Sequence, residues 1–80
     1  MEIDQLDIFA MLQLELENAR EKHPEFPEVP AEGMNVILEE VLELVRSVND
    51  NESLSRQREE AFHVAVTALR FIVNNLKLEN

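Results

Sequence analysis

The segment that decides the fold runs from Ser55 to Leu78 and reads SRQREEAFHVAVTALRFIVNNLKL. It contains neither glycine nor proline and is rich in good helix formers, so it predicts one long α-helix. Apolar side chains surround most of this helix. A narrow polar stripe remains, at spacings i, i+3, i+7, i+10 and i+14: Glu60, His63, Thr67, Arg70 and Asn74. A helix that is apolar on nearly every side is typically central and buried.

The chain is short for a helix of this kind. Its 80 residues provide one domain at most and too little protein to surround the helix. It has no cysteine, so disulfides and cysteine-based zinc sites are excluded. A second copy of the chain would complete the burial. We therefore expect an all-α bundle of three helices that is completed by oligomerisation, as a homodimer or tetramer.

Two breaks divide the chain. All three prolines and the single glycine fall within residues 23–33, HPEFPEVPAEG, which predicts a loop with room for a short helical turn. A weaker break at 49–53, NDNES, offers Ser53 as an N-cap for the last helix, with Ser55 as the alternative. No strand-like alternation is present. The expected helices are 3–22, 34–49 and 55–78.

The charge balance limits the partners. The chain carries 17 acidic and 7 basic residues, a formal net charge of −10. This charge opposes binding to bare DNA or RNA and to anionic membranes, but not to a nucleotide that arrives with a divalent cation. The acidic N-terminus does not resemble a secretory signal, and no apolar run approaches the roughly 20 residues of a membrane span. We therefore expect a cytoplasmic protein.

The helix expected at 34–49 has two faces. Its apolar face comprises Ile37, Leu38, Val41, Leu42, Leu44, Val45 and Val48. Its polar face comprises Glu39, Glu40, Glu43, Arg46, Ser47 and Asp50. Glu40 and Glu43 project side by side because they are three residues apart. Two interpretations remain open: a solvated acidic face, or a cation held between this pair and Glu60 with His63, as in bundle cores that bind metals through carboxylates of facing helices.

These residues, taken in order, resemble a known family. Sixteen residues separate the run Glu39-Glu40-Val41-Leu42-Glu43 from Glu60-Ala61-Phe62-His63. Together the two runs are similar to the E-E-x-x-E … E-x-x-D signature of the MazG-like all-α nucleoside triphosphate pyrophosphohydrolases. The flanking segments 17–27, 34–38 and 64–70 resemble the small phage and mobile-element branch of that family. The resemblance covers about Leu14 to Asn74, most of the chain.

The resemblance implies a magnesium-dependent hydrolase that splits a nucleoside triphosphate into the monophosphate and pyrophosphate. It implies metal ligands at Glu40, Glu43 and Glu60, and an outer-shell or water-activating role for Glu39. Family sites also place cationic side chains near the triphosphate. The candidates for substrate binding in this chain are Arg20, Lys22, Arg70 and Lys77, together with Asn74.

His63 stands where the signature has aspartate. An imidazole nitrogen suits Mn²⁺, Ni²⁺ or Zn²⁺ better than Mg²⁺. We therefore expect His63 to be a metal ligand in a site for Mg²⁺ that also accepts Mn²⁺. Three functions remain open: a nucleotide pyrophosphohydrolase, a nucleotide- or metal-binding protein of the same fold that has lost hydrolysis through His63, and a helical interaction module whose glutamates are only a solvated face.

Overall fold

The computed structural model describes residues 5–76, which form three α-helices and no strand. Helix α1 spans Gln5–Lys22, α2 spans Pro30–Asn49 and α3 spans Leu54–Asn75. The predicted all-α class with three helices is confirmed, whereas the expected helical ends at 3–4 and 77–78 lie outside the described residues. None of the described helices has the length and hydropathy needed to cross a bilayer.

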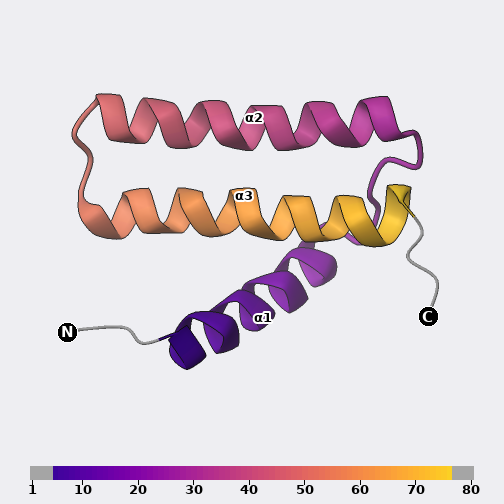
Figure 1. The fold of residues 1–80 in the computed structure, drawn as a ribbon, viewed down its shortest axis with the longest axis horizontal. Helices are drawn as coiled ribbons and strands as arrows, with labels where there is room; N and C mark the ends of the chain where they lie inside the picture. Colours follow the sequence, from indigo (N-terminus) through magenta and orange to yellow (C-terminus); the bar gives the residue numbers. More distant parts are fainter. Residues whose placement is uncertain (1–4, 77–80) are drawn as a thin grey trace.

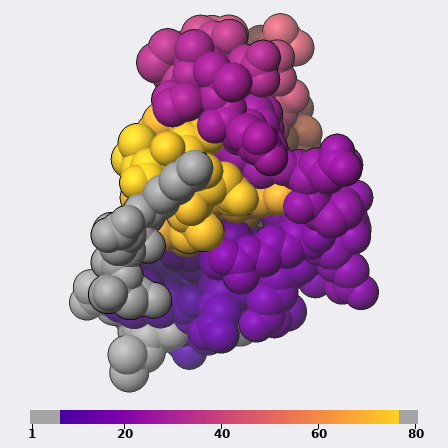
Figure 2. All heavy atoms as spheres, turned by 90° about the vertical axis from the view of Figure 1, so that its right-hand side faces the viewer, coloured from indigo at the N-terminus to yellow at the C-terminus, as the bar shows by residue number. Residues whose placement is uncertain are grey.

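Helix α3 is the middle element of the fold. Helices α2 and α3 run side by side as an antiparallel hairpin, and α1 crosses the other side of α3 at an angle (Figure 1). Within residues 5–76, α1 and α2 each pack against α3 and not against each other. Figure 2 shows the same order from the end of the hairpin, with α3 between α2 and α1. Any side chain on the inner faces of α1 and α2 therefore meets α3.

Helix α2 begins four residues earlier than the sequence predicts, at Pro30 instead of Met34. Proline suits the first helical position, because its missing N–H would have no intrahelical acceptor there and its φ angle is already helical. Gly33 is consequently a helical residue and not part of the loop. The expected loop at 23–33 is thus reduced to the residues between Lys22 and Pro30.

Gly33 is buried against the C-terminal end of α3. A Cβ atom at this position would lie 2.8 Å from Cδ1 of Phe71 and would collide with Oδ1 of Asn75. Asn75 is not free to move aside, because its side-chain amide donates a hydrogen bond to the Pro27 carbonyl oxygen at 2.7 Å. The glycine is therefore explained by close helix packing and not by a turn.

A short, capped turn joins α2 to α3. Asn51 has a φ of 52°, in the left-handed region that asparagine tolerates better than most residues. The Ser53 Oγ accepts a hydrogen bond from the Arg56 backbone N–H at 3.1 Å, so Ser53 is the N-cap of α3. This turn fixes the start of α3, and with it the register of the side chains that face α2.

In the part of the chain for which burial is described, more polar than apolar side chains are buried. Among residues 7–76, Val66 is the one hydrophobic residue that is fully buried, at 5% exposure. The buried polar or charged residues are Ser47, Glu60, Thr67, Arg70 and Asn75. Four of these five lie on α3, so the inner side of the central helix is largely polar.

The apolar face of α2 is covered only in part by the rest of the described chain. Leu38, Leu42, Val45 and Val48 are 53%, 54%, 47% and 48% exposed. Glu40 and Ser47, which belong to the polar face expected from the sequence, lie on the side that meets α3. Apolar residues occupy a wide arc of α2, and the arc that packs on α3 is the one with the small residues Gly33 and Ser47.

We expect Gly33→Ala to destabilise the protein by about 1–3 kcal/mol, the usual range for overpacking a tight interface. The added methyl group clashes with Phe71 and Asn75, and this outweighs the gain of roughly 1 kcal/mol in helix propensity. Urea unfolding measures the difference, with exposed Glu32→Ala as the control in the same turn. A Gly33→Ala protein as stable as the wild type would contradict the packing described here.

Candidate metal site

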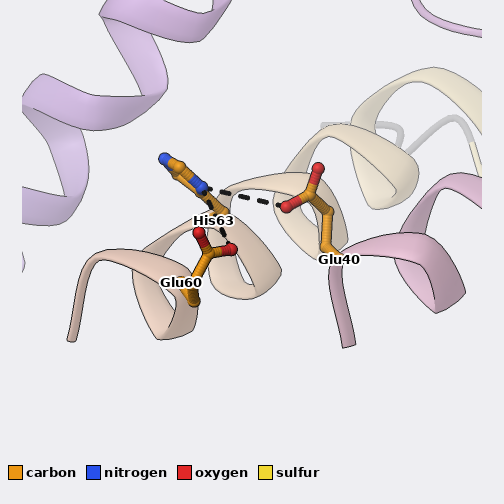
Figure 3. Close-up of side chains that lie close together, drawn as sticks. All are labelled: Glu40, Glu60 and His63. Atoms are coloured by element: carbon orange, nitrogen blue, oxygen red, sulfur yellow. Dashed lines mark ion pairs between the residues drawn. The ribbon is translucent and has the colours of Figure 1, made fainter. Parts of the chain in front are cut away.

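Three side chains from two helices converge between α2 and α3. They are Glu40 of α2 and Glu60 and His63 of α3 (Figure 3). One ligand atom of each lies within 4.8 Å of the other two. His63 Nδ1 is 3.8 Å from Glu40 Oε2 and 3.7 Å from Glu60 Oε2. Both separations are too long for hydrogen bonds and suit two ligands of one ion bound at about 2.0–2.3 Å.

The spacing of α2 explains why Glu40 faces α3. Gly33, Glu40 and Ser47 are seven residues apart, two helical turns each, and therefore lie on one side of the helix. Gly33 and Ser47 are buried and small, so they let the backbone of α2 approach α3 on either side of Glu40. On α3, Glu60 and His63 are three residues apart and share the face that Glu40 meets.

The carboxylate oxygens that point to this position accept no hydrogen bond, and each forms a long ion pair with the His63 imidazole. Glu60 has a side chain that is 2% exposed, and Glu40 one that is 26% exposed. Glu40 Oε2 and Glu60 Oε2 are both buried without a hydrogen bond. A buried polar atom left in this state costs about 1–3 kcal/mol, and more when its group is charged. A cation between the two oxygens would remove that cost.

Burial raises the pKa of Glu40, and the neighbouring Glu43 carboxylate raises it further. The His63 imidazole acts in the opposite direction, and Glu60 adds to the rise. The environment of Glu40 therefore disfavours a negative charge as long as no cation is near. A bound metal ion would reverse this balance, because it interacts favourably only with the ionised carboxylate.

The other two glutamates of the motif lie outside this group of three. Glu43 is close enough to Glu40 to affect its pKa, but its side chain is exposed. Glu39 is also exposed on α2. The structure thus brings together three of the four residues for which the sequence suggests metal binding, Glu40, Glu60 and His63, and leaves Glu43 at the edge of the site.

Glu40 and His63 also line a cavity of about 510 Å³ that reaches α1 and the loop after it. Its volume lies within the usual range of small-molecule sites, about 300–1,000 Å³. Lys22 and Arg70, two of the candidate substrate-binding residues, line the same cavity. Carboxylates and cationic side chains thus face one space, as a metal-bound anionic ligand requires.

Arg70 is 8% exposed and holds the loop against α3. Its Nη2 donates a hydrogen bond to the His23 carbonyl oxygen at 2.5 Å, and its guanidinium lies over the Phe26 ring, 5.2 Å from the centroid. Burial lowers the pKa of Arg70, and the nearby Arg20 lowers it further. No carboxylate of the described residues forms an ion pair with Arg70, and its Nε has no acceptor.

The remaining candidates lie elsewhere. Arg20 affects Arg70 electrostatically but does not line the cavity. Asn74 donates its side-chain amide to the Arg70 carbonyl oxygen at 2.7 Å and lines a different hollow, formed mainly by residues 24–29. Lys77 lies outside the described residues.

Sequence reasoning missed Arg56, which forms an ion pair with Glu60, although the i, i+4 spacing of opposite charges is a signal for such a pair.

We expect Glu40→Gln to raise the melting temperature of the metal-free protein by a few degrees at pH 7 and to change it little at pH 4. A raised pKa stabilises the fold at low pH, and this contribution is lost as the pH rises from the ordinary range of glutamate through the raised pKa. Glutamine imitates the protonated acid at every pH. Thermal unfolding with a chelator present measures the effect, and exposed Glu39→Gln is the control. An equal change in melting temperature at pH 4 and pH 7 would contradict a raised pKa of Glu40.

No family model, curated protein or solved structure matches the chain. The MazG-like resemblance therefore depends on the motif residues and their spacing alone. The convergence of Glu40, Glu60 and His63 is therefore the main structural indication of function.

Proposed function

We propose that the protein is a divalent-metal-dependent nucleoside triphosphate pyrophosphohydrolase of the MazG-like kind, which yields a nucleoside monophosphate and pyrophosphate. One observation supports it above all: two buried carboxylate oxygens that accept no hydrogen bond, Glu40 Oε2 and Glu60 Oε2, face His63 Nδ1 from two helices. A solvated acidic face does not account for Glu60, whose side chain is 2% exposed. All three residues also belong to the motif that resembles the family.

The donor set fits a divalent cation. Glu40 and Glu60 would each give one oxygen and His63 one nitrogen, which suits Mn²⁺ and is acceptable to Mg²⁺ with water in the other positions. Glu43, three residues from Glu40, is the exposed carboxylate best placed to join them. Binding should weaken as the pH falls, since protons compete with the metal for all of these ligands.

The cavity would hold the triphosphate. Lys22 and Arg70 offer positive charge to phosphate oxygens, and no carboxylate of residues 5–76 forms an ion pair with the Arg70 guanidinium. In the reaction, a water oxygen bonds to the α-phosphorus, and the bond from that phosphorus to the bridging oxygen breaks, so that pyrophosphate leaves. A bound divalent ion supplies charge neutralisation and a more acidic water. Glu39, exposed beside Glu40, is the proposed proton acceptor.

A panel of ribo- and deoxyribonucleoside triphosphates with Mg²⁺ or Mn²⁺ tests this function through pyrophosphate release. We expect turnover of at least one nucleotide, and a fall of at least about tenfold in Glu60→Gln, which removes a ligand charge. Exposed Glu21→Gln is the matched control and should retain activity.

The same experiment separates the alternatives. Metal or nucleotide binding without turnover would favour a binding protein that has lost hydrolysis, for which the departure at His63 gives a physical reason. If neither metal nor nucleotide binds, the protein is better described as a helical interaction module and the proposed function is wrong.

We also propose that two copies of the chain pair through α2. Apolar residues follow this helix at alternating steps of four and three: Met34, Leu38, Val41, Val45 and Val48. All except Val41 are about half exposed or more. This spacing is typical of a seam between two packed helices. Two-fold symmetry would place the same face of each copy against the other.

The exposed apolar surface is thus on α2 more than on α3. On α3, Val66 is 5% exposed, and Phe62 and Leu69 are partly covered. Val73 and Leu76 at the end of α3 are about half exposed.

Sedimentation at micromolar concentration should give at least a dimer, because burying the α2 seam removes several large apolar side chains from water. We expect Val45→Lys to shift the protein toward the monomer, and Asn35→Lys, at an exposed polar position of α2, to leave it assembled. A stable wild-type monomer under these conditions would overturn the proposed pairing.

A further inference from the structure

The two oxygens of the Glu60 carboxylate have different environments. Oε1 lies 2.6 Å from Nη2 of Arg56, which precedes Glu60 by one turn of α3. Oε2 has no hydrogen-bond partner and lies 3.7 Å from His63 Nδ1. The ion pair therefore occupies the oxygen that faces away from the candidate metal position. The other oxygen remains available to an ion.

Arg56 is itself held by the start of α3. Its backbone N–H donates to the Ser53 Oγ at 3.1 Å, and its Nη1 lies 3.3 Å from Oε1 of Glu59. The Glu60 carboxylate, followed by that of Glu59, raises the pKa of Arg56. Its side chain is 46% exposed, so the guanidinium spans from solvent to a carboxylate that is almost fully buried. The N-cap thus fixes the backbone from which Arg56 reaches Glu60.

We propose that Arg56 is a positioning residue of the metal site, which orients the buried Glu60 carboxylate so that Oε2 faces Glu40 and His63. This inference rests on the proposed metal site. Arg56 does not touch the ion. It acts through Glu60, as groups hydrogen-bonded to metal ligands commonly do.

Two effects of Arg56 on metal affinity have opposite signs. A positive charge near the site repels a cation, so its removal would tighten binding. This repulsion is weakened by solvent because the guanidinium is about half exposed. Loss of a group that orients a metal ligand usually weakens binding by about 10–100-fold. Because Glu60 is buried with its carboxylate fixed between Arg56 and the site, the orienting effect is the larger.

The test is Mn²⁺ binding to the full chain, measured by isothermal titration calorimetry at constant pH. We expect Arg56→Gln to raise the dissociation constant about tenfold. Arg58→Gln, an exposed arginine on the same helix, should leave it unchanged and controls for general loss of positive charge. Arg56→Lys keeps a charged donor for Oε1 and should restore most of the affinity.

A double-mutant cycle shows whether Arg56 acts through Glu60. In a Glu60→Gln background, Arg56→Gln should have no further effect on Mn²⁺ binding. An arginine that acts only by repelling the cation would change the affinity in both backgrounds by a similar factor.

Three results would overturn the proposal. The first is an unchanged or tighter dissociation constant in Arg56→Gln, even if its metal-free melting temperature falls, since that pattern describes a purely structural ion pair. The second is an equal effect of Arg56→Gln with and without Glu60. The third applies if Arg56→Gln does not fold, because Arg56→Lys then decides. A dissociation constant for Mn²⁺ that rises about tenfold or more in Arg56→Lys, despite native stability, counts against charge-assisted orientation. A wild type that binds no Mn²⁺ removes the metal site itself, which is a different failure.

Discussion

The polar stripe on the buried side of α3 is the constraint on which the rest of the structure depends. Each of its members needs a partner away from water, because an unpaired polar group there is costly. Thr67 donates to the His63 carbonyl oxygen of its own helix at 2.7 Å. Arg70 of the stripe reaches a carbonyl oxygen of the loop instead, as does Asn75, a buried residue of α3 outside the stripe, and both contacts tie that loop to α3. These polar contacts, more than a large apolar core, hold the loop after α1 in place.

At the N-terminal half of α3, two carboxylate oxygens accept no hydrogen bond from the described residues. Arg56 pairs with one oxygen of Glu60, and the other oxygen faces His63 and the Oε2 of Glu40, which also accepts no hydrogen bond. The hairpin brings Glu40 there because Gly33 and Ser47 allow close packing of α2 on α3. The geometry that leaves two carboxylate oxygens without hydrogen bonds is also the geometry that we propose for binding a divalent cation. Hydrolysis of a bound nucleotide is the function we propose for it.

The sequence alone predicts the three helices, since glycine, proline and cap residues mark the breaks between them. It misplaces the start of α2, because the need for glycine at Gly33 comes from Asn75 and Phe71, far away in the chain. It identifies Glu40, Glu60 and His63 through their spacing, but the wide apolar arc of α2 hides which side meets α3. The recurrence of Gly33, Glu40 and Ser47 every seven residues is the signal that would have shown it.

The most direct test of the metal site is a crystal structure of the protein grown with Mn²⁺, with diffraction data collected to measure anomalous scattering. The account predicts a strong anomalous peak between α2 and α3, about 2.0–2.3 Å from Glu40 Oε2, Glu60 Oε2 and His63 Nδ1. Manganese bound only to exposed glutamates, with no peak among these three side chains, would contradict it.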